Sequence, residues 1–223
     1  MLTSVRSSDE LFRRGYCRVQ GFLSPAEAAY WLAQVDGRRD AFRLVGAKGG
    51  LGLPFRVLDG VEARRHLAHV CAALQPRMQH AAEQAAEQCF EPIRDPRRAL
   101  RLQRYQDRKE GFRWHFDGSH TSALLTLANT SRGATDVVSP RWTPLLKPLF
   151  YALYPVRGTF SLLPHATLVA EPGDLLILNG RAVLHRGAAG SQPGERVVLL
   201  AAFDPAGSKP RPIRDWIARR FNY

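Results

Sequence analysis

The chain has 223 residues, a formal net charge of +12 at pH 7 and 45% hydrophobic residues, which is an ordinary composition for a soluble globular protein. No apolar run approaches the roughly 20 residues of a membrane helix, and the N-terminal residues lack the apolar core of an export signal. We therefore expect a cytoplasmic protein with no membrane span. The basic residues are scattered along the chain, which indicates a solvated basic surface and argues against a nucleic-acid partner. The three cysteines form no CxxC pair and are expected to be reduced thiols.

The first third of the chain predicts one strand followed by helices. Residues 15–23 are rich in alternating apolar and aromatic side chains and predict a strand. Ser24 can cap a helix that begins at Pro25 and ends near Asp36-Gly37. Residues 1–98 as a whole are expected to supply this strand and the supporting helices.

A glycine-rich loop and a longer helical stretch come next. Residues 38–58 predict a loop with a short strand near its end, at 55–58, and its glycines match no phosphate-binding motif. Residues 61–90 are rich in Ala, Leu, Gln and Glu and predict helix. Pro76 is expected to split this stretch into two pieces.

From residue 99 the sequence changes to short strand-like runs that Gly, Pro, Asn and Asp mostly separate. Such runs over 99–203 predict an antiparallel sandwich or barrel, so the fold class is mainly β with flanking helices, α+β, in a single domain. Residues 130–158 are too long for a hairpin turn and are expected to form an insert that folds over a site as a lid. Residues 204–223 predict a short amphipathic helix.

The segment Trp114-His115-Phe116-Asp117 carries the first chemical signal. Residues two apart on a strand point to the same face, so His115 and Asp117 should face one way and the two aromatic residues the other. One imidazole and one carboxylate at this spacing supply two corners of a 2-His-1-carboxylate metal site. A single HxD triplet is weak evidence, because it arises by chance in many proteins.

The downstream sequence strengthens this signal. Residues 171–178 form a turn followed by the apolar strand DLLIL, and a second histidine, His185, follows in the run AVLHRG. Arg196 then opens the apolar strand RVVLLAAF. An arginine that points inward from such a strand needs an anionic partner.

The combination of HFD, GDLLIL, HRG and the later arginine resembles the iron(II)- and 2-oxoglutarate-dependent dioxygenases, most closely their prolyl-hydroxylase-like and phytanoyl-CoA-dioxygenase-like members. The motif resemblance covers residues 99–203 and the N-terminal part only loosely. It implies a double-stranded β-helix core, also described as jelly-roll or cupin-like. It implies Fe(II) as the metal, 2-oxoglutarate as cosubstrate and O2 as oxidant.

The resemblance also implies roles for individual residues. His115, Asp117 and His185 would be the metal ligands, Arg196 would bind the far carboxylate of 2-oxoglutarate, and Tyr105 would hydrogen-bond the same carboxylate. Asp117 stands where halogenating relatives have Gly or Ala, which favours oxygenation. Ala202 stands where nucleic-acid demethylases of this superfamily carry a second arginine, and we see no lysine matching the one that the asparaginyl-hydroxylase and JmjC branches use.

Three further residues are candidates for substrate binding. Arg113 shares a face with His115 on a regular strand, His120 follows the HxD motif closely, and Trp142 belongs to the expected lid. A surface arginine, a loop histidine and ordinary core packing explain them equally well.

Three functions remain open on the sequence alone. The leading interpretation is an oxygenase that hydroxylates an unactivated C–H bond of a small molecule, such as an amino acid, a lipid or a natural-product intermediate, with release of succinate and CO2. A peptidyl or protein hydroxylase of the prolyl type is the second. A non-catalytic metal- or nucleic-acid-binding β-barrel is the third, and it would require arginines clustered on one face.

Overall fold

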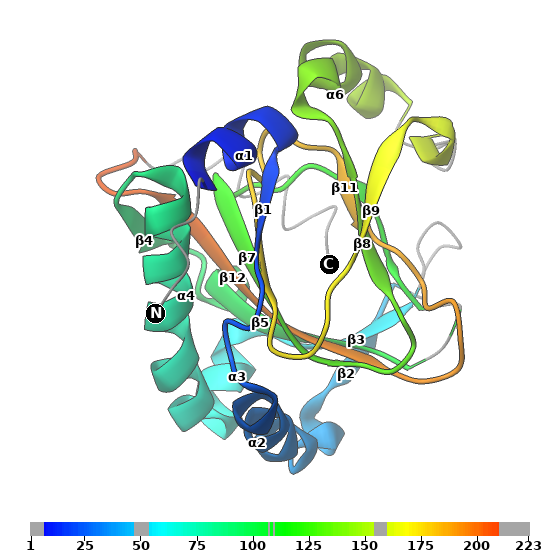
Figure 1. The fold of residues 1–223 in the computed structure, drawn as a ribbon. Helices are drawn as coiled ribbons and strands as arrows, with labels where there is room; N and C mark the ends of the chain where they lie inside the picture. The colour runs from blue at the N-terminus through cyan, green and yellow to red at the C-terminus, as the bar shows by residue number, and fades with distance from the viewer. Residues whose placement is uncertain (1–6, 47–53, 107, 109, 154–159, 210–223) are drawn as a thin grey trace.

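Two antiparallel sheets face each other across the centre of the molecule, as Figure 1 shows for this computed structural model. The structure describes residues 7–46, 54–106, 108, 110–153 and 160–209. The major sheet has the strand order β1-β10-β7-β12-β5-β3-β2, with β4 also paired to β12, and the minor sheet has the order β6-β11-β8-β9. This arrangement is the expected double-stranded β-helix.

The strands of the major sheet come from both halves of the chain. Their bounds are Tyr16–Val19 for β1, Arg43–Val45 for β2, Phe55–Leu58 for β3, Phe90–Pro92 for β4, Leu100–Tyr105 for β5, Thr121–Asn129 for β7, Leu175–Leu178 for β10 and Arg196–Pro205 for β12. The minor sheet comes only from the second half, with β6 at Phe112–His115, β8 at Ala134–Val138, β9 at His165–Val169 and β11 at His185–Gly187.

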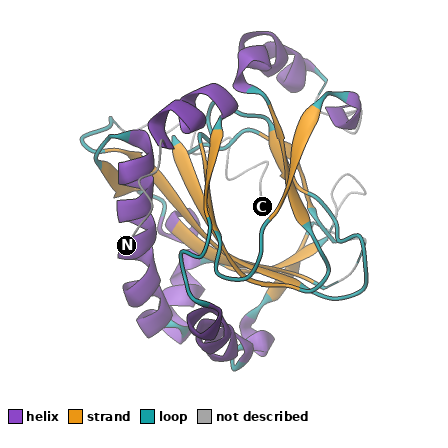
Figure 2. Cartoon of the chain, in the orientation of Figure 1, coloured by secondary structure: helices purple, strands orange, loops and turns teal. Residues whose placement is uncertain are grey.

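Helices cover the outer face of the major sheet (Figure 2). The helices before the core are α1 (Ser7–Arg14), α2 (Pro25–Asp36), the short η1 (Arg39–Ala41), α3 (Gly60–His66), α4 (Ala68–Ala86) and α5 (Pro96–Ala99). Helices α2 and α4 pack on β7. Their apolar residues join those of the sheet in the largest core cluster, which includes Val35, Leu74 and Met78 from the helices and Leu125 and Leu199 from the sheet. No helix among these described residues is long and apolar enough to cross a membrane.

The start of α2 follows the predicted capping pattern. The Ser24 hydroxyl accepts a hydrogen bond from the amide of Glu27, and the Glu27 carboxylate accepts one from the amide of Ser24. Pro25 occupies the first helical position. The strand before this helix is shorter than the predicted 15–23, because Gly21 adopts a positive φ of 61° and turns the chain.

Two sequence-based boundaries were wrong. The helical stretch breaks at Leu67 rather than at Pro76, and α4 continues through Pro76 over 19 residues. A proline removes one amide donor, and α4 tolerates this loss because its buried side chains hold it against the sheet.

Residues 130–158 are not wholly an insert, since β8 lies within them and pairs with β9 and β11.

The rest of that segment forms η2 (Pro140–Trp142) and α6 (Thr143–Ala152), which lie at one end of the barrel in Figure 1. The predicted C-terminal helix at 204–223 conflicts at its start with β12, which runs to Pro205. Residues 210–223 are outside the described part of the chain.

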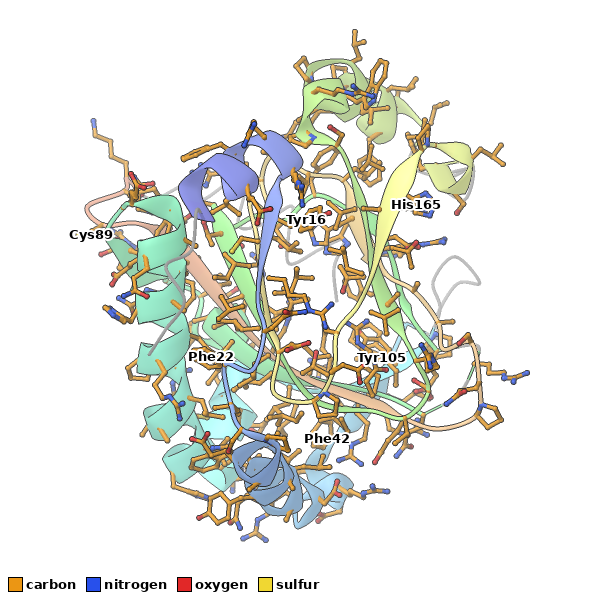
Figure 3. All side chains as sticks on the ribbon, in the orientation of Figure 1. Tyr16, Phe22, Phe42, Cys89, Tyr105 and His165 are labelled. Carbon is orange, nitrogen blue, oxygen red and sulfur yellow. The ribbon has the colours of Figure 1, made fainter. Side chains whose placement is uncertain are left out.

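The cysteines are free thiols, as expected. Cys17 and Cys71 are buried, whereas Cys89 is exposed at the end of α4 (Figure 3). Burial raises the pKa of both Cys17 and Cys71 to about 11. These two thiols therefore stay protonated at neutral pH.

A buried ion-pair network ties the helical layer to the sheet. The Arg104 side chain is 1% exposed, donates to Glu195 Oε2 at 2.9 Å and also pairs with Asp36 at the end of α2. Burial by itself would raise the pKa of Asp36, but hydrogen bonds from Arg104 and Arg39 lower it. The two acids keep some solvent contact.

We predict that Arg104→Gln lowers the free energy of unfolding by about 2–3 kcal/mol. This is less than the loss when a wholly buried pair is broken, because Asp36 and Glu195 can regain water. The midpoint of thermal unfolding should fall by about 4–12 °C. Arg43→Gln is the control, since the Arg43 side chain is half exposed and reaches the buried Asp59 only at 3.5 Å, so its loss should change stability by under about 1 kcal/mol. Equal losses in the two variants would contradict the role of the Arg104 network.

Candidate metal centre

Neighbouring strands of the minor sheet bring the three predicted ligands together. His115 ends β6 and His185 begins β11, and the two residues face each other directly in the antiparallel register. Asp117 follows β6 and is fixed by its backbone amide, which donates to the Gly180 carbonyl at 2.9 Å. The strand alternation holds as predicted, because Trp114 and Phe116 point away into a separate apolar cluster with α6.

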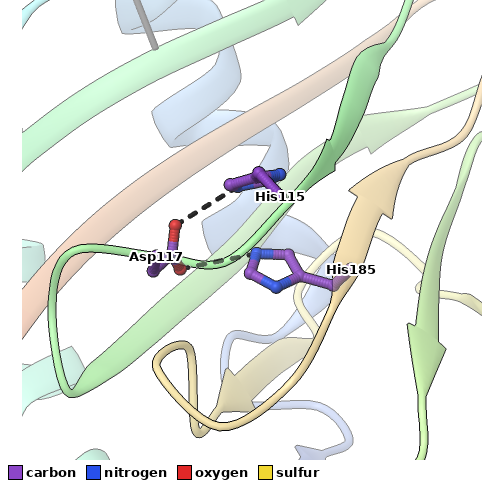
Figure 4. A group of neighbouring side chains, drawn as sticks. All are labelled: His115, Asp117 and His185. Atoms are coloured by element: carbon purple, nitrogen blue, oxygen red, sulfur yellow. Dashed lines mark ion pairs between the residues drawn. The ribbon is translucent and has the colours of Figure 1, made fainter. Parts of the chain in front are cut away.

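The three side chains converge on one point, as Figure 4 shows. His115 Nε2 lies 3.2 Å from Asp117 Oδ1, and His185 Nε2 lies 3.4 Å from Asp117 Oδ2. One ligand atom from each residue falls within 4.8 Å of the others. All three side chains are at most 9% exposed. Two imidazoles and one carboxylate in this arrangement are a donor set suited to a divalent transition metal with open coordination positions.

The backbone selects which ring nitrogen faces the centre. His115 Nδ1 lies 2.8 Å from the Arg113 carbonyl, and His185 Nδ1 lies 3.1 Å from the Val183 carbonyl. A carbonyl only accepts hydrogen bonds, so both Nδ1 atoms carry the hydrogen. Both Nε2 atoms therefore present a lone pair toward Asp117, which is the orientation that metal-bound histidines need.

Electrostatics hold the protonation states that metal binding requires. Burial lowers the pKa of His115 to about 4, helped by the charge of His185. Burial by itself would raise the pKa of Asp117, but the neighbouring His185 and His115, whose protonated forms attract the carboxylate, lower it well below its usual range. At neutral pH His115 is neutral and Asp117 is ionised, as metal ligands must be.

Ser122 supports the carboxylate and was missed by sequence reasoning. Its hydroxyl, at the start of β7, donates to Asp117 Oδ2 at 2.6 Å. A hydrogen bond of this kind fixes the rotation of a ligating carboxylate. No motif marks Ser122, because its proximity to Asp117 depends on how the loop between β6 and β7 folds.

Gly180 sits against the same carboxylate. A Cβ atom at this position would lie 2.5 Å from Asp117 Oδ2 and 2.8 Å from Asp117 Cβ. These separations are too short, and Asp117 would have to move. A one-ångström displacement matters at a site that requires convergent ligands.

We predict that Gly180→Ala weakens metal affinity by about 10–100-fold, the usual effect of disturbing a group that orients a ligand. Equilibrium dialysis with Mn(II) measures this change. Gly37→Ala is the control, because a Cβ there meets only carbonyl oxygens at 3.5 Å and beyond. Unchanged Mn(II) affinity in Gly180→Ala would contradict the claim that the contact with Gly180 holds Asp117 in its metal-binding position.

Arg196 is buried in a cavity that the three candidate metal ligands also line, and it can bind an anion there. It is 3% exposed, and its guanidinium donates to the Ala134 carbonyl at 2.6 Å and to Thr135 Oγ1 at 2.9 Å. Its buried Nε has no hydrogen-bond partner among the described residues. A guanidinium that is held in place and has a donor to spare fits a carboxylate ligand.

Tyr105 stands opposite Arg196 in the strand register and lies between the two sheets (Figure 3). The Arg196 guanidinium lies 6.0 Å from the Tyr105 ring centre, and the phenol donates to Gln103 Oε1 at 2.9 Å. Burial raises the pKa of Tyr105 to about 12, although the charges of Arg196 and Arg101 oppose this shift. The phenol therefore remains a hydrogen-bond donor at every ordinary pH.

One cavity connects the metal centre to Arg196. Its walls hold the three candidate metal ligands together with Arg196 and Tyr105. They also hold residues that no motif predicted, namely Arg101, Gln103, Phe112, Leu124, Thr135, Gly187, Val198 and Leu200.

The three predicted substrate residues do not line this cavity. The carbonyl of Arg113 accepts the His115 hydrogen bond, and its side chain is half-buried. His120 lies against the Phe90 ring at 5.8 Å and its amide donates to Asp204. Trp142 is 42% exposed on η2. Their predicted substrate roles therefore stay predictions, and the cavity gives them no support.

Solved structures with this architecture include several enzymes. No protein-family model matches the sequence, and no curated protein matches it significantly. The carbocyclase SnoK from nogalamycin biosynthesis, described as non-heme and α-ketoglutarate-dependent, superposes with a TM-score of 0.72 at 15% identity, covering 98% of this chain and 91% of SnoK.

Two further structures contain ligands. The epimerase SnoN, in complex with Fe3+, α-ketoglutarate and nogalamycin RO, has a TM-score of 0.69 at 18% identity, covering 94% of this chain and 88% of SnoN. HygX from Streptomyces hygroscopicus, with nickel, 2-oxoglutarate and hygromycin B bound, has a TM-score of 0.64 at 15% identity, covering 92% of this chain and 88% of HygX. The chain therefore has the double-stranded β-helix fold of the iron- and 2-oxoglutarate-dependent oxygenases.

Proposed function

We propose that this chain is an iron(II)- and 2-oxoglutarate-dependent oxygenase that acts on a small molecule. The observation that carries the proposal is the convergence of His115, Asp117 and His185 in the same cavity as the buried Arg196. A 2-His-1-carboxylate set is the donor set of non-haem Fe(II) oxygenases. Arg196 adds the guanidinium that a dicarboxylate cosubstrate needs.

Each protein group has a defined task in this proposal. The triad would hold the metal through the two histidine rings and the Asp117 carboxylate, at one wall of the cavity. Arg196 binds the far carboxylate of 2-oxoglutarate, with hydroxyl groups of Thr135 and Tyr105 nearby. When bound, iron(II), 2-oxoglutarate and dioxygen together supply the oxidising chemistry, with succinate and CO2 as the products of the cosubstrate.

The protein also controls access of water. Phe112, Leu124, Val198 and Leu200 give the cavity apolar walls between its polar groups. Such walls exclude water and strengthen the electrostatic contacts inside. No protein acid or base is needed for the oxidation, so the task of the chain is to orient the C–H bond that reacts.

Two structurally similar proteins support the proposal that the substrate is a small molecule. SnoN and HygX hold nogalamycin RO and hygromycin B, which are small molecules. We propose hydroxylation of an unactivated C–H bond as the reaction, which adds one oxygen atom to the substrate mass. We further propose that residues 1–223 act as one domain, because α2 and α4 pack on the major sheet, which forms one wall of the cavity.

The test is calorimetric titration of 2-oxoglutarate into the Mn(II)-loaded protein without oxygen. Binding should depend on the metal and should be absent in the metal-free protein. Acetate at the same concentration is the ligand control, since it has only one carboxylate. Failure of the Mn(II)-loaded protein to bind 2-oxoglutarate would overturn the proposed function.

A further inference from the structure

The outer face of the minor sheet carries a network of side-chain contacts that crosses the whole sheet. Asp136 on β8 accepts a hydrogen bond from Arg186 Nε on β11 at 2.8 Å and another from Thr167 Oγ1 on β9 at 2.8 Å. The Arg186 guanidinium also lies 4.8 Å from the centre of the Trp114 ring on β6. These contacts therefore join β6, β11, β8 and β9, which are the strands of the minor sheet in their order.

Ser161, in the segment before β9, closes this network. Its Oγ accepts hydrogen bonds from Arg186 Nη1 at 2.8 Å and from Trp114 Nε1 at 3.0 Å. Arg186 is therefore the central member, since it contacts the carboxylate, the hydroxyl and the indole. The Asp136 side chain is 3% exposed and the Arg186 side chain is 30% exposed. A charge-assisted hydrogen bond of this kind is stronger than a neutral one, and the planar guanidinium fixes its geometry.

Three of these strands carry a network residue directly beside a residue of the candidate site. The neighbouring pairs are Trp114 and His115 on β6, Arg186 and His185 on β11, and Asp136 and Thr135 on β8. Adjacent residues on a strand point to opposite faces, so one member of each pair belongs to the network and the other to the cavity wall. Thr135 is the residue that accepts a hydrogen bond from Arg196 Nη2. A shift of one strand within the network therefore moves a residue of the site.

The strand that carries His185 is short and irregular. Strand β11 has three residues, and its register with β6 shifts between His185 and Gly187. Such a shift interrupts the regular ladder of backbone hydrogen bonds. On its other side, the register places Arg186 directly opposite Asp136 on β8. The ion pair therefore adds a side-chain restraint to a strand whose backbone ladder is short and interrupted.

Building on the proposed function, we propose that Arg186 is a positioning residue for the metal centre. Its contacts with Asp136 and Trp114 fix β11 between β8 and β6. The fixed strand in turn sets where His185 meets His115. Ligands of a metal site need to be held within about 0.5 Å of their working geometry. Arg186 acts through these strands and not by contact with the metal, because its side chain lies on the outer face of the sheet.

Arg18 provides a matched control for loss of stability alone. It donates from Nε to the Asp174 carboxylate at 3.1 Å, and its side chain is 30% exposed, as is that of Arg186. Asp174 is buried, like Asp136. Neither Arg18 nor Asp174 is among the described residues that line the cavity. Replacing Arg18 therefore removes a comparable ion pair at the major sheet and leaves the candidate metal centre untouched.

The experiment compares Mn(II) affinity, measured by equilibrium dialysis, with the midpoint of thermal unfolding of the metal-free protein. The variants are Arg186→Met, Arg186→Lys and Arg18→Met. We expect both methionine variants to lower the midpoint by a similar amount. Mn(II) affinity should fall about tenfold in Arg186→Met, the usual scale for a group that orients a ligand, and should stay unchanged in Arg18→Met. Arg186→Lys should recover part of the affinity, since an ammonium can still pair with Asp136.

Unchanged Mn(II) affinity in Arg186→Met would overturn the proposal, and so would an equal loss of affinity in Arg18→Met. If either methionine variant does not fold, Arg186→Gln and Arg18→Gln provide the same comparison with the same contradicting results. A failure of the proposed function is distinct from these results. The wild type would then bind Mn(II) with no affinity for 2-oxoglutarate, while the difference between the two arginines would still be measurable.

Discussion

Asp117→Ala should reduce metal affinity by about 10²–10³-fold. Binding of a structural metal by four ligands is worth about 10–16 kcal/mol, so one ligand contributes roughly 2.5–4 kcal/mol. Asp117 is also the only anionic member of the triad. Its loss leaves two neutral imidazoles, which bind a divalent ion weakly.

Thermal unfolding with and without Mn(II) measures this effect. A metal at 100 times its dissociation constant stabilises the native state by about 2.7 kcal/mol, which raises the midpoint by about 5–11 °C in a protein of this size. Asp117→Ala should lose this rise. Asp204→Ala is the control, because Asp204 pairs with Arg181 and does not line the cavity. A full metal-induced rise in Asp117→Ala would place the metal elsewhere.

Arg196→Gln should weaken 2-oxoglutarate binding by about 10²–10³-fold while metal affinity stays unchanged. A buried charge-assisted contact that loses one partner costs about 2–5 kcal/mol, because the other charge remains in the cavity without a counter-charge. Arg196→Lys should recover only part of the affinity, since an ammonium cannot form two parallel hydrogen bonds.

The control for Arg196 is Arg104→Gln. Arg104 is as deeply buried as Arg196, but it pairs with Asp36 and Glu195 and lies outside the cavity. Arg104→Gln should lower stability and leave 2-oxoglutarate affinity intact at temperatures where the variant is folded. If calorimetric titration instead gives Arg196→Gln the same 2-oxoglutarate affinity as the wild type, Arg196 does not belong to the cosubstrate site.

Local periodicity explains which features the sequence could predict. Alternation along a strand was enough to predict that His115 faces the opposite side from Trp114 and Phe116. The capping pattern at Ser24 was enough to predict where α2 begins. These predictions depend on residues close in sequence. The predicted break at Pro76 was wrong for the opposite reason. The break lies at Leu67, because tertiary packing of α4 decides where the helix continues.

The residues missed in the site depend on strand pairing. Thr135 reaches Arg196 only because distant strands adopt a specific register, whereas Ser122 reaches Asp117 through the fold of the short loop between β6 and β7. Arg101 lines the cavity because β5 lies beside β12. A single sequence contains no local signal for these pairings, so such residues read as ordinary strand positions. The predicted substrate role of Trp142 stays a prediction, because Trp142 is not among the described residues that line the cavity.

The most direct measurement of the central claim is succinate formation by protein purified without oxygen and then supplied with iron(II), 2-oxoglutarate and oxygen. We predict slow succinate formation even without the substrate, because the triad and Arg196 assemble the oxidising site on their own. Asp117→Ala and Arg196→Gln should reduce it to background. No succinate from the iron-loaded wild type, or equal rates in the wild type and both variants, would contradict the assignment of this cavity as an oxygenase site.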